Sequence, residues 1–199
     1  MSKTLHLIYI PGLGDSDPNG HRKAVGWWAK YGVEAELFRM NWADKESWAQ
    51  KFARLLARID ELTKEGKAVG LVGASAGAGA VVNAFAARKD KIIGCVLIAG
   101  KVNRPKAIGQ GYRQKNPSFV ESAYAVPAAL ESLTPADRRR ILSRYALADE
   151  TVYKPDSRIQ GARNRIVPSI GHAVTIGTQI TLGAPSFIHW FKKLQATDK

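Results

Sequence analysis

Residues 69–77 read Val-Gly-Leu-Val-Gly-Ala-Ser-Ala-Gly, an apolar strand-like run that leads directly into the pattern Gly-x-Ser-x-Gly at residues 73–77. This pattern is typical of a nucleophile elbow, a sharp turn between a strand and a helix that exposes a serine hydroxyl at the edge of a sheet. Glycines two residues before and after Ser75 remove the Cβ atoms that would clash in so tight a turn. Residues 76–88 are the expected helix, whose amino end favours developing negative charge. The alternative is a Gly/Ala-rich turn with an incidental serine. Only other residues of the chain can distinguish these two interpretations.

The composition predicts a single domain over residues 1–199. Of these 199 residues 45% are hydrophobic, which suffices for one substantial core. No apolar stretch is long enough to cross a bilayer, and the amino-terminal run is too polar for a secretion signal. The single cysteine, Cys95, lies in an apolar run, so neither an internal disulfide nor a cysteine-based metal site is expected. These features together predict a cytoplasmic protein.

Basic residues are in excess, mainly in the second half of the chain. Lys and Arg total 30 against 17 Asp and Glu, a net charge of +13, and residues 101–199 hold 16 of the basic and 7 of the acidic residues. The arginines that stand out here are Arg138, Arg139, Arg140, Arg144, Arg158, Arg163 and Arg165. Such charge attracts nucleic acid, anionic lipid or acidic substrates. Without interleaved aromatic residues, a zinc pattern or a helix-turn-helix pattern, we expect a solvated basic surface and no nucleic-acid partner.

Apolar runs alternate with helical patterns along the chain. Besides the run before the elbow, strands are expected at residues 4–10, 33–40, 92–99, 140–147 and 163–170. Helices are expected at residues 20–31, 44–66, 76–88, 117–133 and 185–194. Six strands with intervening helices and no hairpin signals predict an α/β fold, a three-layer α/β/α sandwich around a mainly parallel sheet of about six strands.

A long connection at residues 101–139 is a candidate for a small lid over the site. Aromatic side chains could border a pocket there, although core packing explains each of them equally well. These are Trp27, Trp28, Trp42, Tyr112, Phe119 and Tyr124.

A serine hydroxyl becomes a good nucleophile only when a base removes its proton, and the base needs a third group to orient it. The chain has four histidines. His6 lies within a strand, His21 opens a helix, and His189 lies between apolar residues of the last helix, so packing or solvent contact explains all three. His172 follows a strand and a glycine, where a loop can return toward the sheet edge that bears Ser75. His172 is therefore the predicted base.

The predicted acid is Asp149, which directly follows an expected strand at the same edge of the sheet. Its neighbour Glu150 points elsewhere if Asp149 points inward. Asp156 is a competing candidate, but it follows a proline in an expected surface turn or helix start, where Asp commonly caps. The resulting chain order is Ser75, Asp149, His172.

An acyl-transfer site also needs hydrogen-bond donors for the oxyanion of the tetrahedral intermediate. The backbone N–H of Ala76, next after the serine, is one predicted donor. The N–H of Leu13, between two glycines in the loop at residues 11–14, is the other. A purely structural turn would also contain these glycines.

Four segments resemble the signature points of the α/β-hydrolase superfamily, in the same order and across nearly the whole chain. They are Pro-Gly-Leu-Gly at 11–14, Gly-Ala-Ser-Ala-Gly at 73–77, Ala-Asp-Glu-Thr-Val at 148–152 and Ile-Gly-His at 170–172. The size is similar to that of small retinoblastoma-binding-protein-9-like serine hydrolases, and residues 12–16 resemble the oxyanion loop of acyl-protein thioesterases and carboxylesterases. Two departures are Pro11, where many members have His, and the missing amino-terminal antiparallel strands, which implies a minimal core.

The resemblance implies a serine hydrolase that cleaves an ester or thioester of a small molecule through an acyl-enzyme on Ser75, with no cofactor and no metal. The alternatives are a binding or regulatory protein that keeps the fold without useful catalysis, and an acyltransferase with an acceptor other than water. Residues 77–79, Gly-Ala-Gly, do not complete a dinucleotide-binding pattern, and the histidines are not spaced as metal ligands. Neither the acyl group nor an oligomeric state follows from the sequence.

Overall fold

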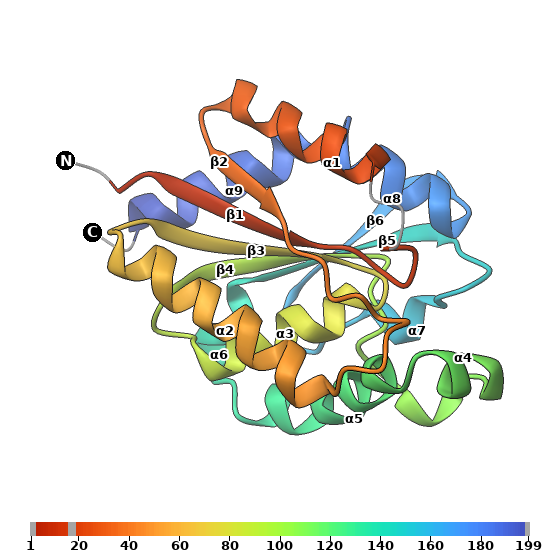
Figure 1. Ribbon diagram of the computed structural model, residues 1–199. Helices are drawn as coiled ribbons and strands as arrows, with labels where there is room; N and C mark the ends of the chain where they lie inside the picture. Colours follow the sequence, from red (N-terminus) through yellow and green to blue (C-terminus); the bar gives the residue numbers. More distant parts are fainter. Residues whose placement is uncertain (1–2, 16–18, 198–199) are drawn as a thin grey trace.

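The computed structural model describes residues 3–15 and 19–197, so Ser16, Asp17 and Pro18 of the expected oxyanion loop lie outside the described residues. Six strands form one sheet in the order β2-β1-β3-β4-β5-β6, and every neighbouring pair is parallel (Figure 1). They are β1 (Leu5–Ile10), β2 (Glu34–Leu37), β3 (Ala68–Ala74), β4 (Ile92–Ile98), β5 (Ile141–Ala148) and β6 (Arg163–Ile170). The predicted α/β class with a mainly parallel sheet of about six strands is confirmed.

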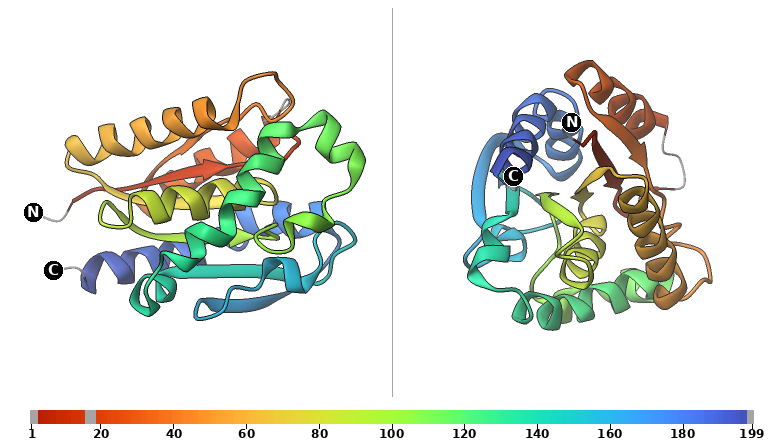
Figure 2. Two further views of the ribbon diagram at one scale, coloured as in Figure 1. Left: turned by 90° about the horizontal axis from the view of Figure 1, so that it is seen from below. Right: turned by 90° about the vertical axis from the view of Figure 1, so that its left-hand side faces the viewer.

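Helices cover both faces of the sheet, as Figure 2 shows. One face carries α1 (Asn19–Gly26), the 3-10 helix η1 (Trp27–Tyr31), α8 (His172–Ile180) and α9 (Ala184–Thr197). The other carries α2 (Trp48–Lys64), α3 (Gly77–Ala87) and α5 (Pro117–Glu131). Shorter helical segments are η2 (Pro105–Ala107), α4 (Gln110–Lys115), α6 (Pro135–Arg139) and α7 (Lys154–Ser157). Over the described ranges, no helix has the length and apolar character needed to cross a membrane.

The core consists of two apolar layers, one on each face of the sheet. Every residue of β1, β3 and β4 is buried, and successive side chains of a strand enter opposite layers. In β1, for example, Ile8 packs in the α2/α3 layer, whereas Leu7 and Tyr9 pack in the α8/α9 layer. Trp28 and Trp42 are fully buried core residues, so packing accounts for both.

Two of the differences from the sequence prediction concern helices next to the site. Helix α2 begins at Trp48 and not near residue 44, because Ser47 and Gln50 form a reciprocal capping box that starts the helix there. Residues 172–180 form helix α8, where a loop was expected, so His172 is the first residue of a helix.

Candidate active site

Ser75 lies at the turn between β3 and α3 and has a backbone φ of 52°, a left-handed conformation that is strained for a residue other than glycine. Backbone hydrogen bonds hold it there: the Ser75 N–H donates to the Ile98 carbonyl at 3.0 Å, and the Ser75 carbonyl accepts from the N–H of Ala78 and of Lys101. The turn at residues 73–77 thus has the geometry of the predicted elbow.

Two glycines allow neighbouring backbone to approach this turn. A Cβ atom on Gly77 would lie 2.2 Å from the Ile10 carbonyl oxygen, so only glycine lets α3 start directly against the end of β1. A Cβ atom on Gly12 would lie 2.8 Å from the Ser75 Cβ and 3.3 Å from its Oγ. Gly12 therefore brings the loop after β1 into contact with the serine side chain.

The structure brings Ser75, His172 and Asp149 together in one hydrogen-bonded chain. His172 Nε2 lies 2.9 Å from Ser75 Oγ, and His172 Nδ1 lies 2.8 Å from Asp149 Oδ2. Because a carboxylate only accepts hydrogen bonds, the imidazole carries its proton on Nδ1, which leaves the Nε2 lone pair to accept from the serine hydroxyl. The side chains of His172 and Asp149 are 14% and 3% exposed, so water has little access to their contact.

Asp149 is itself fixed by backbone donors. Its Oδ1 accepts from the N–H of Thr151 at 2.8 Å and of Val152 at 2.7 Å, which leaves Oδ2 for the imidazole. Glu150 does not take the place of Asp149 at the imidazole ring, but its carboxylate accepts the backbone N–H of His172 at 3.1–3.2 Å. No sequence pattern indicated this contact of Glu150, which anchors the start of α8 to the loop after β5.

Asp156, the competing candidate for the acid, lines the same hollow as Ser75, but His172 pairs with Asp149 and not with Asp156. It lies at a helix start, in α7, as one of the two predicted alternatives, but it is not at the surface: it is 2% exposed and forms ion pairs with Lys101 at 2.8 Å and Arg104 at 2.7 Å. Burial alone would raise the pKa of Asp156, but hydrogen bonds from Arg104 and Lys101 outweigh it and lower the pKa. The two cations come from a distant segment of the chain, and they are what makes a buried aspartate tolerable at this position.

Both predicted oxyanion donors lie beside the serine. Leu13 and Ala76 line the same cavity as Ser75, and within the described residues neither backbone N–H donates a hydrogen bond to another protein group. Such unpaired donors next to a nucleophile are suited to an oxyanion.

The loop that carries Leu13 is held by Asn41 and Trp42, which follow β2. The buried Asp15 side chain accepts the Asn41 N–H at 2.6 Å, and the Trp42 indole N–H donates to the Pro11 carbonyl at 3.2 Å. Burial raises the pKa of Asp15 above its ordinary value, although the backbone N–H groups of Asn41, Trp42 and Met40 act in the opposite direction.

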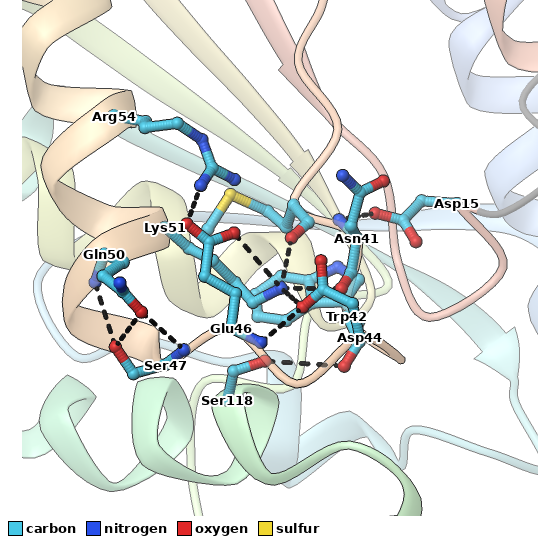
Figure 3. A network of polar contacts seen from close by, with 11 residues as sticks. Asp15, Asn41, Trp42, Asp44, Glu46, Ser47, Gln50, Lys51, Arg54 and Ser118 are labelled. Carbon is cyan, nitrogen blue, oxygen red and sulfur yellow. Dashed lines mark hydrogen bonds and ion pairs between the residues drawn. The ribbon is translucent and has the colours of Figure 1, made fainter.

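Lys51 supports the residues that hold this loop, as Figure 3 shows. Its side chain is 0% exposed, and its ammonium donates to the carbonyls of Met40 at 2.8 Å and Asn41 at 2.6 Å and to the Asp44 carboxylate. Asn41 has a positive φ of 52°, so this ammonium stabilises an unusual turn. A chain of contacts thus runs from α2 to the loop beside Ser75.

Two hollows flank the serine. The first has a volume of about 200 Å³ and is walled by the elbow, the segment at residues 101–119 and the loop after β5. Tyr112 and Phe119 line it, whereas Tyr124, Trp27, Trp28 and Trp42 do not.

The second hollow, of about 550 Å³, lies between α1 and α8 and includes His21 and His172. Burial lowers the pKa of His21, whose Nδ1 lies 2.9 Å from the buried Tyr9 hydroxyl. Across the described ranges, no His, Cys, Asp and Glu side chains are grouped as metal ligands.

No family model and no curated protein matches the sequence, but many solved structures match the fold. A carboxylesterase of the thaumarchaeon Nitrososphaera gargenis is 11% identical, with 98% of this chain and 92% of that chain covered and a TM-score of 0.70. The monoacylglycerol lipase of Paleococcus ferrophilus is 13% identical, with 97% of each chain covered and a TM-score of 0.61. An S-formylglutathione hydrolase from Agrobacterium tumefaciens is 13% identical, with 98% and 85% covered and a TM-score of 0.65. The chain therefore has the α/β-hydrolase fold, as the resemblance implied.

Proposed function

We propose that this protein is a serine hydrolase that cleaves an ester or thioester of a small molecule through an acyl-enzyme on Ser75. The observation that carries the proposal is the chain of hydrogen bonds from Ser75 through His172 to Asp149. A carboxylesterase, a lipase and an S-formylglutathione hydrolase among the proteins of similar fold support the same reaction class.

Each group then has a role that follows from its position. His172 Nε2 takes the proton of Ser75 as the hydroxyl attacks the substrate carbonyl, and the Asp149 carboxylate stabilises the resulting imidazolium. The N–H groups of Leu13 and Ala76 donate to the oxyanion of the tetrahedral intermediate. His172 next gives the proton to the departing alkoxide or thiolate, and in the second half-reaction it activates the water that releases the acid.

The smaller hollow is proposed to hold the acyl group. Its volume of about 200 Å³ is below the range of roughly 300–1,000 Å³ typical of sites for drug-sized ligands. Its wall combines apolar side chains, such as Ile108 and Phe119, with the ion-paired Lys101 and Arg104. This wall limits the acyl chain to a short one, and the segment at residues 101–139 acts as a cover over it.

The test is hydrolysis of a series of p-nitrophenyl esters by the wild type and by Ser75→Ala. Turnover should fall by about three to six orders of magnitude in Ser75→Ala, and short acyl chains should be preferred in the wild type. Ser132→Ala, at an exposed serine at the end of α5, is the matched control and should keep full activity. Equal turnover in wild type and Ser75→Ala would refute the proposal.

Two alternatives give different results in the same samples. A binding protein without catalysis would not react at Ser75 with a fluorophosphonate probe, whereas a hydrolase is labelled to one equivalent. An acyltransferase would pass the acyl group to an added alcohol or amine in preference to water, which product analysis would reveal.

A further inference from the structure

Three arginines line a hollow at the β6 edge of the sheet. The hollow is on the face covered by α8 and α9, whereas α3, the helix that follows Ser75, covers the other face. They are Arg144 from β5 and Arg163 and Arg165 from β6. The hollow has a volume of about 430 Å³, and its remaining lining is Leu142, Val167, Gln179, Gly183, Ser186 and Trp190. We refer to it as the arginine hollow. None of its lining residues lines either hollow beside Ser75.

The strand register forces these charges together. Arg144 and Arg165 are direct partners in the parallel pairing of β5 and β6, and Arg163 lies two residues before Arg165, on the same face. Like charges placed opposite each other in a sheet are destabilising. The lining of the hollow contains no carboxylate that would compensate them. Burial, together with the charge of Arg165, lowers the pKa of Arg144. The three guanidinium groups thus form a concentrated positive site.

The three arginines differ in how they are held. Arg144 is fixed: its Nη1 donates to Gln179 Oε1 at 2.9 Å and to the Gly183 carbonyl at 3.2 Å, its Nη2 donates to Ser186, and its guanidinium lies over the Phe187 ring. Arg163 and Arg165 are exposed, and in the described part of the chain their guanidinium groups have no hydrogen-bond or ion-pair partner. Two guanidinium groups are therefore available to a ligand.

Other arginines of the basic half are used by the fold itself. Arg138 donates to three backbone carbonyls, and Arg140 donates to two carbonyls and to Asp137 while its guanidinium covers the Phe85 ring. Trp190, which lines the arginine hollow, has a buried indole N–H without a partner among the described residues.

We propose that the arginine hollow binds a small molecule that carries a phosphate or pyrophosphate group. Guanidinium groups match phosphate oxygens in pairs of parallel hydrogen bonds, and a phosphate has enough charge and oxygen atoms to engage two forks at once. A single carboxylate would satisfy only one fork. The hollow is local and has one aromatic residue in its lining, which favours a small ligand over an extended polyanion with stacked bases.

The test is titration calorimetry with sodium pyrophosphate and inorganic phosphate, in phosphate-free buffer at constant ionic strength. The wild type is compared with the double variant Arg163→Gln/Arg165→Gln and with a control, Arg139→Gln/Arg158→Gln, which removes the same charge at two exposed arginines outside the hollow. Loss of charge-assisted hydrogen bonds should weaken binding at least about tenfold in the hollow variant and less than about twofold in the control. Unchanged melting temperatures without ligand verify that both variants fold.

The results separate a built site from diffuse charge. An equal loss of affinity in both double variants, or no pyrophosphate binding by the wild type up to millimolar concentration, would overturn the proposal. Glycerol 3-phosphate and vesicles containing phosphatidic acid distinguish a free phosphate ester from a lipid headgroup, and a response of either one confined to the hollow variant supports the site. A single-stranded oligonucleotide that binds more tightly than pyrophosphate and responds to both double variants would instead assign the charge to nucleic acid and reject a small-molecule site.

Discussion

The substitution Asp149→Asn tests the proposed role of the acid, because the structure fixes which way the new amide must face. Both backbone donors, from Thr151 and Val152, converge on Oδ1, and His172 Nδ1 donates to Oδ2. An asparagine that keeps its oxygen at the Oδ1 position turns its NH₂ group toward the imidazole. Nδ1 must then accept, the ring proton moves to Nε2, and Nε2 can no longer receive the proton of Ser75.

The alternative is that the amide flips, and its cost can be estimated. The flip turns the NH₂ group toward two backbone N–H donors, and each donor left without an acceptor costs about 1–3 kcal/mol, or about 2–6 kcal/mol together. At about 1.36 kcal/mol for each factor of ten, the flipped and active form is about 30-fold to about 3 × 10⁴-fold less populated. Loss of the correct tautomer costs about 10⁴ in kcat in a serine protease triad. We therefore expect kcat/KM at pH 7 to fall by about 30-fold to 10⁴-fold.

The assay is hydrolysis of p-nitrophenyl acetate, with the rate of fluorophosphonate labelling of Ser75 as a second readout. The melting temperature should change little, because asparagine retains the acceptor for the two backbone donors. Asp90→Asn removes the same charge at an exposed turn and should leave both rates as in the wild type. A loss smaller than tenfold in Asp149→Asn would refute the reasoning, because the imidazole would then be oriented by something other than Asp149.

Three further substitutions test the supports of the site and of the fold. Gly12→Ala places a Cβ atom 2.8 Å from the Ser75 Cβ, so displacement of the nucleophile should lower kcat by about 10²-fold in the ester assay; unchanged kcat would contradict this contact. Lys51→Met leaves two backbone carbonyls and a carboxylate without their donor and should reduce the free energy of unfolding by about 3 kcal/mol in urea denaturation; a loss below about 1 kcal/mol would show that water replaces the ammonium. Burial alone would raise the pKa of Asp137, but hydrogen bonds from Thr134 and Arg140 lower it to about 2, so this carboxylate stabilises the fold above pH 4. Asp137→Asn should therefore cost about 2 kcal/mol at pH 7, and a difference from wild type that does not shrink as the pH falls from 4 to 2 would exclude this origin.

The sequence was most informative where residue type and position relative to a strand end coincide. Ser75, Asp149 and His172 each follow a strand, and parallel strands end at one edge of a sheet, so their meeting could be anticipated. Asp156 also lies between β5 and β6, but from the sequence it was expected at the surface. It is buried because it pairs with Lys101 and Arg104, which lie about fifty residues away in the chain. No local sequence pattern predicts such a pairing.

Helix α8 was missed for a different reason. Residues 172–180 contain β-branched residues and a glycine, which have low intrinsic helix propensity. Contacts with β4, β5 and β6 outweigh that propensity. Tertiary packing of this kind cannot be read from a nine-residue window.

The position of α8 explains how His172 reaches Ser75. Ser75 follows β3 and His172 follows β6, and three strand spacings of about 4.8 Å separate these strands by roughly 14 Å, more than a histidine side chain spans. The chain closes the gap by turning back over β5: Gly171 has a φ of 93°, and its N–H donates to the Ala148 carbonyl at 2.9 Å. The Glu150 carboxylate then accepts the N–H of His172. Both contacts come from the loop and strand that carry Asp149, so the base and its orienting acid are positioned as one unit against the serine.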